Sequence, residues 1–380
     1  MEQISNRSYV KHGFLALASS QCTPCTPPPG GGNDLGLGCS DTYGAGTNAS
    51  NFWLGPPDEI DAFNGAWDPN CSLFDLGLSG TVCDGNRSYD GTGLGPLGNR
   101  VKVHDDDLDL PGATYWFQAY YVVKQELESV RRNNFHSRRF TASLVGNSYN
   151  INEAPAEVEP NRSVTERWID GPNPADLVIE GISSPANVVS GTVLDGSVYV
   201  AYQVTEPSPG VYHYEYAVHN RDNARGVGRF ELPLCPGASI SNFGTSDTTL
   251  TTGDDWSASI SADDTTLVIE DTSGTNDIRW NNLFNFWFDS NAAPAFGNGE
   301  LVAANPGPGN DSINARIYAP SGSCQAALIP YGCAVNDCDM TVTGTPALGQ
   351  AVNYELDNPA LSQEEIAKLQ ALQQALQGGS

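Results

Sequence analysis

The middle of the chain reads Ser197-Val-Tyr-Val-Ala-Tyr-Gln-Val-Thr205-Glu-Pro-Ser-Pro-Gly210-Val-Tyr-His-Tyr-Glu-Tyr-Ala-Val-His219, which is two alternating arms joined by a turn. A period of two places alternate side chains on one face of a strand. The proline and glycine residues between the arms favour a reversal of the chain. The stretch therefore predicts an antiparallel hairpin with one buried face, formed by Val198, Val200, Tyr202, Val204, Tyr212, Tyr214, Tyr216 and Val218.

Short apolar or alternating runs continue on both sides of this hairpin. They predict strands at residues 100–103, 113–124, 140–151, 176–182, 188–193, 198–205, 211–220, 228–234, 257–261, 266–270, 283–288 and 313–318. Many short strands separated by turns are typical of two packed antiparallel sheets. The predicted fold is therefore mainly β, with an antiparallel two-sheet β-sandwich over residues 99–332. Two runs, 115–123 and 283–288, are apolar on both faces, so we expect them to be central strands.

The remaining segments differ in composition from the sandwich region. Residues 1–21 look like a truncated export signal, because basic Arg7 and Lys11 precede a short apolar run that begins at Phe14. Residues 22–98 are rich in Gly, Pro and Cys and predict an irregular region tied by disulfides. Residues 333–360 predict a short β segment. Residues 361–380 predict an amphipathic helix, since Ser362 and Glu365 have the spacing of a capping box.

The nine cysteines indicate an oxidising compartment, because no second Cys-x-x-Cys pair completes a zinc site. The pairs that we expect are a cross-link among Cys39, Cys71 and Cys83, a bridge between Cys235 and Cys324, and a loop closed by Cys333 and Cys338. Cys22 and Cys25 have the spacing of a redox motif, although they lie in a Pro/Gly-rich stretch. We therefore expect the protein to be secreted or located at the cell surface.

Charge excludes some partners. Lys and Arg number 18 and Asp and Glu number 45, which gives a formal net charge of -27. Such a surface repels phosphate backbones, so nucleic acid is not expected as a partner. No apolar run is long enough to predict a membrane span. Self-association through sheet edges or through the 361–380 helix is expected instead, and carbohydrate is a further candidate partner.

Two acidic segments suggest calcium, which binds several oxygen ligands at once. Asp105, Asp106, Asp107 and Asp109 crowd together, and Asp84, Asn86, Ser88 and Asp90 follow the alternate spacing of a calcium loop. The second segment departs from an EF-hand, because Tyr89 stands at the glycine position and Gly95 at the position of the bidentate glutamate. An ordinary polar turn explains the same residues. His213, Glu215 and His219 share the strand face opposite the tyrosines, so His213 and Glu215 could bind one metal ion together. A solvent-facing polar row explains the same residues.

Two stretches resemble a known group of proteins. Cys39-Ser-Asp-Thr-Tyr43, and Tyr212-His-Tyr-Glu-Tyr-Ala-Val-His-Asn220 followed by Gly228-Arg-Phe-Glu-Leu-Pro-Leu234, are similar to uncharacterised secreted bacterial proteins with Ig-like β-sandwich domains. The resemblance implies export and a β-sandwich, and it carries over no functional residue. The chain departs from that group after Asp339, where the helical segment replaces the expected C-terminal module.

No hydrolase elbow, zinc-protease motif or phosphate-binding loop occurs in the sequence. We therefore favour a secreted structural or binding protein of unknown ligand, self-assembling and stabilised by calcium. An extracellular polysaccharide hydrolase with unidentified carboxylates is the first alternative, so catalysis stays open. A redox or metal-binding protein built on Cys22, Cys25, His213 and His219 is the second.

Overall fold

The computed structural model describes most of the β-rich part of the chain. The described residues are 1–7, 9–11, 25–26, 39, 54–68, 70–75, 100–124, 127, 134–154, 159–168, 176–183, 196–249, 256–307 and 310–322. Several predictions lie outside them, namely the 361–380 helix, the 333–360 segment, the Cys333–Cys338 loop and the candidate calcium loop at residues 84–90. Within the described residues, no helix is both long and apolar enough to cross a membrane.

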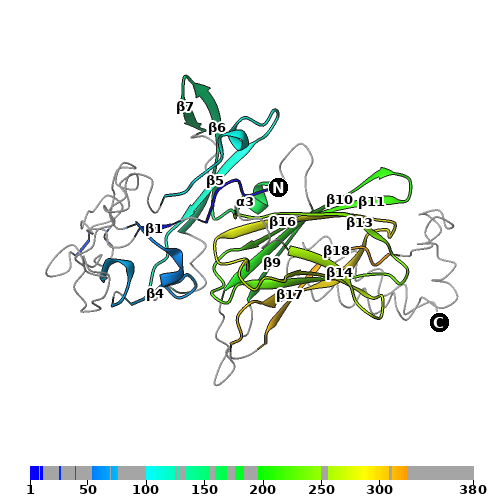
Figure 1. Cartoon of the computed structure of the whole chain (residues 1–380). Coiled ribbons are helices and arrows are strands. Elements are labelled where there is room, and N and C mark those ends of the chain that lie inside the picture. Colours follow the sequence, from blue (N-terminus) through cyan, green and yellow to red (C-terminus); the bar gives the residue numbers. More distant parts are fainter. Residues whose placement is uncertain are drawn as a thin grey trace, which may run out of the picture.

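Two five-stranded antiparallel sheets face each other and form the β-sandwich (Figure 1). In order across the first sheet, the strands are β13 (Ile240–Ser246), β16 (Asn282–Ser290), β11 (Val211–Asn220), β10 (Ser197–Ser208) and β9 (Asp176–Ser183). The second sheet runs β14 (Trp256–Ile260), β15 (Thr266–Asp271), β12 (Val227–Pro233), β17 (Ala295–Ala303) and β18 (Ser312–Ala319). The prediction of a mainly β, two-sheet protein is confirmed.

The hairpin of β10 and β11 has the pairing that its alternation predicts. Val200 lies opposite Val218, and Tyr202 lies opposite Tyr216. These four side chains are at most 2% exposed, since they point between the two sheets. The register shifts only between Thr205 and Ser208, beside the turn. The hairpin therefore supplies two of the three inner strands of the first sheet, as a half-buried pair should.

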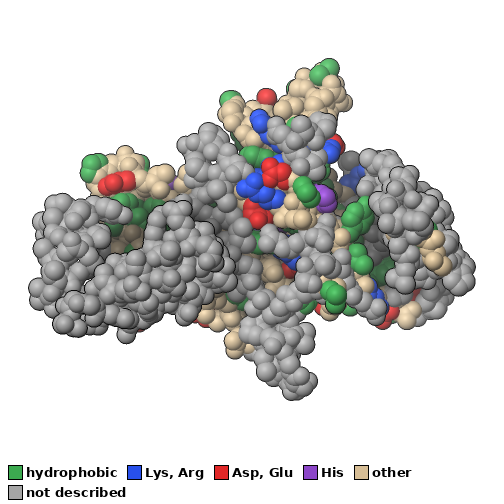
Figure 2. Space-filling model, turned by 180° about the vertical axis from the view of Figure 1, so that it is seen from behind, with side chains coloured by type: hydrophobic (Ala, Val, Ile, Leu, Met, Phe, Trp, Pro, Cys, Tyr) green, Lys and Arg blue, Asp and Glu red, His purple; other side chains and the backbone are tan. Residues whose placement is uncertain are grey.

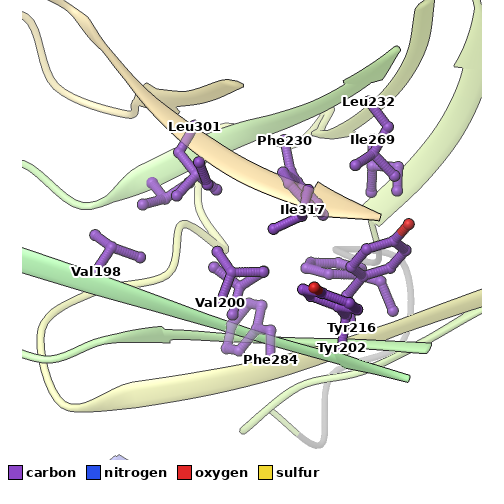
Figure 3. Close-up of a cluster of buried hydrophobic side chains, with 14 of the residues drawn as sticks. Val198, Val200, Tyr202, Tyr216, Phe230, Leu232, Ile269, Phe284, Leu301 and Ile317 are labelled. Carbon is purple, nitrogen blue, oxygen red and sulfur yellow. The ribbon is translucent and has the colours of Figure 1, made fainter. Parts of the chain in front are cut away.

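Aliphatic and aromatic side chains together fill the space between the sheets (Figure 3). Tyr216 from the first sheet meets Phe230 from the second edge-to-face, with ring centroids 5.4 Å apart. Its buried hydroxyl donates to the carbonyl oxygen of Tyr318 at 2.8 Å, and burial raises the pKa of this phenol. Tyr214 donates in the same way to the Ala292 carbonyl at 2.7 Å. The core thus accommodates these two phenols because both of their hydroxyl groups have an acceptor.

A smaller sheet lies beside the sandwich. It contains β5 (Tyr115–Tyr120), β6 (Phe135–Val145), β7 (Ser148–Glu153) and β8 (Glu159–Pro160), and the helix α3 (Val164–Trp168) follows it. The expected sandwich range of 99–332 included these strands, but they pair only with one another among the described strands. The central position expected for 115–123 is wrong, because β5 lies at the edge of its sheet and Phe117 is 38% exposed.

Short elements make up the described part of the N-terminal region. They are β1 (Val10–Lys11), β2 (Leu54–Gly55), η1 (Pro57–Glu59), β3 (Ile60–Asp61), β4 (Ala66–Trp67), η2 (Leu73–Asp75) and η4 (Asp105–Leu108). Cys25 forms a disulfide with Cys39. This pairing corrects the expected cross-link of Cys39 with Cys71 or Cys83. Cys71 and Cys235 are disulfide-bonded as well.

Candidate functional site

The outer face of the first sheet carries the side chains that alternate with the core. On β16, Phe284, Phe286 and Phe288 are fully buried between the sheets, so the residues between them point outward. On β11 the buried tyrosines likewise point between the sheets, so the residues that alternate with them point outward. His213, Glu215 and His219 therefore lie on one face, as predicted. The register places Glu215 opposite Trp287 and His213 opposite Asp289. Polar and aromatic groups therefore meet on this surface.

One half of this outer face is covered. Ala201, Ala217 and Leu283 are buried there, and they pack against Val164 and Trp168 of α3 and against Met1. The other half remains partly exposed. We call it the Trp287 face; its residues are Gln203, His213, Glu215, Trp287 and Asp289, with Asn242 and Gly244 from the neighbouring strand β13.

Trp287 lies against the backbone of β13 at Gly244. A Cβ atom at position 244 would stand 2.3 Å from Cζ2, 2.4 Å from Cε2 and 2.6 Å from Nε1 of the indole. Real Cβ contacts are never that short, so the ring occupies the space that any side chain at 244 would need. A register shift between Ser241 and Gly244 accompanies this contact. The indole is thus fixed against one side of the sheet while the side chain stays partly exposed.

A chain of hydrogen bonds fixes the polar groups beside Trp287. His213 Nδ1 lies 2.7 Å from Asp289 Oδ1, and Asn242 Nδ2 donates to Asp289 Oδ2 at 2.6 Å. Asn242 has a φ of 54°, a left-handed conformation that asparagine tolerates better than most residues. The hydrogen bond from Asn242, and then that from His213, lower the pKa of Asp289. Asp289 is therefore a fixed anionic acceptor.

Glu215 flanks Trp287 on the neighbouring strand. Its Oε1 atom accepts a hydrogen bond from Asn285 Nδ2 at 3.4 Å and one from the amine of Met1 at 2.5 Å. The side chain is still 26% exposed. Because a carboxylate has several acceptor positions, Glu215 keeps the capacity to bind a further donor.

A buried polar cluster joins the smaller sheet to the covered half. Gln118 Oε1 accepts from the Val164 amide at 3.0 Å, which orients Gln118 Nε2 toward His219 Nε2 at 3.4 Å. That histidine nitrogen must accept, so in the neutral ring the proton lies on Nδ1 and is donated to Ser163 Oγ at 3.4 Å. Burial, and then the charge of Arg221, lower the pKa of His219 to about 3.

This Ser163–His219 contact has the wrong polarity for nucleophilic catalysis. A catalytic histidine accepts the proton of its serine, whereas His219 donates to Ser163. Ser163 Oγ also accepts a hydrogen bond from the Thr165 amide at 3.1 Å, and Ser163 is fully buried. The cluster therefore holds α3 and β5 on the sandwich, and it offers no hydrolase centre.

A separate cleft of about 530 Å³ lies where the N-terminal region meets the sandwich. Asp58 in the wall of the cleft accepts hydrogen bonds from the side chains of Arg7 and Arg279, the second at 3.2 Å. Arg279 Nε donates in addition to Asp277 at 3.0 Å. The guanidinium of Arg7 stands 5.5 Å from the ring centre of Trp280. Because Asp58 binds Arg279 of the sandwich, these ion pairs help to attach the N-terminal region.

The predicted acidic cluster lies on the short helix η4 and on Asp109, which caps its C-terminal end. Asp105, Asp106 and Asp109 are exposed, and Asp107 is partly buried. A 3₁₀ helix completes a turn every three residues, so successive aspartates point in different directions. In the described part of the chain, no three His, Cys, Asp or Glu side chains are grouped to hold a metal ion. Calcium binding at Asp105, Asp106, Asp107 and Asp109 stays a prediction, and Asp84, Asn86, Ser88 and Asp90 lie outside the described residues.

Those residues of the redox and metal alternative that the structure describes are not grouped with one another. Cys25 is bonded to Cys39, and Cys22 lies outside the described residues. His213 contacts Asp289, while His219 belongs to the buried cluster. Trp287 was the residue that sequence reasoning missed. The alternation of the run 283–288 was the signal that could have found it, because three inward phenylalanines require an outward tryptophan between them.

Comparisons with known proteins add little to this geometry. No protein-family signature and no curated protein sequence matches the chain. Among solved structures, it is similar to the chitin-binding domain of a hyperthermophilic chitinase from Pyrococcus furiosus. The sequence identity is 14% and the TM-score 0.18, over 33% of this chain and 87% of that domain. A TM-score this low does not establish a shared fold, and chitin binding is a property of that domain.

Proposed function

We propose that the protein is an extracellular carbohydrate-binding protein whose binding surface is the Trp287 face. The observation that carries the proposal is the seating of Trp287 on Gly244. Sugar rings present flat C–H faces that pack on an aromatic ring, and hydroxyl groups at their rims seek fixed hydrogen-bond partners. A tryptophan held against a sheet and bordered by polar side chains meets both needs.

The polar border supports a neutral ligand. Asp289 and Asn242 lie on the strand of Trp287 and on its neighbour, Glu215 lies opposite Trp287, and Gln203 lies opposite Glu215, so the face offers acceptors and amide donors. Two carboxylates on the face, together with the net charge of -27, disfavour anionic polysaccharides. A partly exposed sheet surface suits an extended glycan chain better than a small enclosed ligand. The substrate class that we propose is therefore a neutral polysaccharide.

The same residues support binding over hydrolysis. Glycoside hydrolysis needs a carboxylic acid with a raised pKa that can protonate the leaving oxygen. Asp289 has a lowered pKa, and both of its oxygens already accept hydrogen bonds. The disulfide of Cys25 with Cys39, and the bonded state of Cys71 and Cys235, support an oxidising compartment.

Trp287→Ala is expected to lower the affinity for a neutral polysaccharide by about tenfold or more, because the stacking surface is lost. Gly244→Val should produce a similar loss, since its side chain would displace the indole. The measurement is co-sedimentation of the full chain with insoluble chitin and cellulose, and affinity electrophoresis in soluble neutral glucan. Trp67→Ala, a partly exposed tryptophan on β4, serves as the matched control and should bind like the wild type.

Polygalacturonate, an anionic polysaccharide, is the control ligand and should not bind. Failure of the wild-type chain to bind any of the neutral polysaccharides would contradict the proposal. So would equal binding by the Trp287→Ala and wild-type proteins.

A further inference from the structure

Side chains of the Trp287 face are aligned in two rows that run across the strands. In an antiparallel sheet, the side chains of directly paired residues stand next to each other on one face. Thr205 on β10 pairs with His213 on β11, and His213 pairs with Asp289 on β16. Asn242 on β13 extends this row through its hydrogen bond to Asp289 at 2.6 Å. We call these four residues the polar row.

The second row contains the tryptophan. Gln203 pairs with Glu215, and Glu215 pairs with Trp287, which lies against Gly244. The two rows are two residues apart along each strand, which is about 6.4–6.8 Å. Neighbouring strands are about 4.7–4.9 Å apart, so the polar row extends over about 14 Å from β10 to β13. The face therefore has its stacking ring near the β13 end, and polar groups continue from there across the sheet.

The polar row is accessible along its length and is ordered by its own contacts. Thr205 and Asn242, at its two ends, are exposed, and the side chains of His213 and Asp289 are 35% and 19% exposed. Thr205 points outward because Val204, its neighbour in the chain, packs against the core. His213 and Asn242 both hold Asp289 by hydrogen bonds. A ligand would therefore meet groups that are already fixed, which lowers the entropy cost of binding.

We infer that the ligand is an extended β-1,4-linked polysaccharide that lies across the strands, with one sugar on Trp287 and the next sugars along the polar row. The inference rests on the proposed function and adds the linkage and the direction of the bound chain. An extended β-1,4-linked chain advances with each ring by nearly the spacing of strands. Successive rings therefore lie over β16, β11 and β10, and about three sugars occupy the row. A helical α-1,4-linked chain curves away from a straight row after its first contact.

The side chains of the polar row suit sugar hydroxyl groups, which both donate and accept hydrogen bonds. Asp289 accepts, the Asn242 amide and the Thr205 hydroxyl each donate and accept, and the two charged groups of the row contact each other at 2.7 Å. Figure 2 shows basic and acidic side chains gathered together near the middle of the view, so the described surface visible there has no large patch of one charge. Hydrogen bonding, repeated from strand to strand, is therefore the main interaction that the row offers to a chain.

The length and linkage of the bound chain are tested with oligosaccharides. Isothermal titration calorimetry of the full chain is performed with cello-oligosaccharides and chito-oligosaccharides of two to six sugars, and with maltose and maltohexaose. In at least one β-linked series, we expect the affinity to rise by about tenfold from two sugars to three or four and then to level off, because longer chains extend beyond the row. Maltohexaose is expected to bind no better than maltose.

Thr205→Ala tests the far end of the row. A disaccharide on Trp287 does not reach β10, so this substitution should weaken the binding of tri- and tetrasaccharides by about threefold or more and that of disaccharides much less. Trp287→Ala should weaken the binding of all lengths. The matched control is Thr141→Ala, which removes the same hydroxyl group from an exposed position of β6 and should bind like the wild type.

Affinities that do not depend on length in either β-linked series would overturn the inference, and so would binding of maltohexaose as tight as that of the β-linked hexasaccharides. Absence of binding in both β-linked series, with an insoluble polysaccharide still bound through Trp287, would overturn it as well. Equal binding of the trisaccharide by Thr205→Ala and the wild type would refute the direction of the chain. Each of these results leaves the proposed function standing, whereas failure to bind any neutral polysaccharide contradicts that function itself.

Discussion

Phe286→Ala is expected to lower the free energy of unfolding by about 3–5 kcal/mol, a large part of the 5–15 kcal/mol typical of a domain. Phe286 is fully buried and belongs to the first sheet, yet its ring contacts the second sheet. Its centroid lies 5.0 Å from that of Trp256 and 6.4 Å from that of Phe230. Removing the ring would leave a cavity between the sheets that their backbones cannot close.

Chemical denaturation of the full chain, followed by tryptophan fluorescence, measures this effect. Phe296→Ala is the matched control, because Phe296 is 51% exposed and packs only on the outside of the second sheet, against Tyr318 and Arg316. Its loss should cost less than about 1 kcal/mol. Equal destabilisation by the two substitutions would show that Phe286 does not join the two layers.

Acid is expected to destabilise the fold through His219. The folded chain keeps this imidazole neutral down to a pKa of about 3, whereas in the unfolded chain it takes up a proton below about pH 6.5. The unfolded state therefore binds more protons between these values, and stability falls as the pH falls. The slope is about 1.4 kcal/mol per pH unit, so stability drops by about 2 kcal/mol between pH 6.5 and pH 5.

The contribution of His219 is isolated by comparison with His219→Gln. This variant loses some stability at every pH, but it lacks the proton uptake and should show a shallower acid dependence in denaturant titrations. His213→Gln is the control, since His213 is 35% exposed and lies outside the buried cluster. An unchanged slope in His219→Gln would mean that the buried ring is not the source.

The sandwich was predictable wherever alternation was strong. The arms at 198–205 and 211–220 and the run at 283–288 each became a strand of the first sheet. β13 and β17 were missed, because Asn and Gly residues dilute the alternation in Ile240–Ser246 and Ala295–Ala303. These two segments form strands because they pair with neighbouring strands, and not because of a pattern in their own sequences.

The hairpin of β6 and β7 shows a second limit of sequence reasoning. Residues 140–151 were predicted as one strand, but Gly146 and Asn147 form a two-residue turn, and Gly146 has a φ of 66°. The signal for this turn was a change in the phase of the apolar alternation. The large apolar residues before the turn, Phe140 and Leu144, are even-numbered, whereas Tyr149 and Ile151 after it are odd-numbered. The same phase argument, applied to 283–288, would have predicted the outward position of Trp287. Its seat on Gly244 could not be predicted, since no local pattern links strands so far apart.

The close approach of Gly244 to the indole imposes a constraint on evolution. A descendant that keeps the indole of Trp287 in its present position has to retain glycine at 244, whereas one that loses the indole can place a larger residue there. Substitutions at the two positions should thus be coupled across related genomes. That coupling would separate lineages that have preserved this surface from those in which it has decayed.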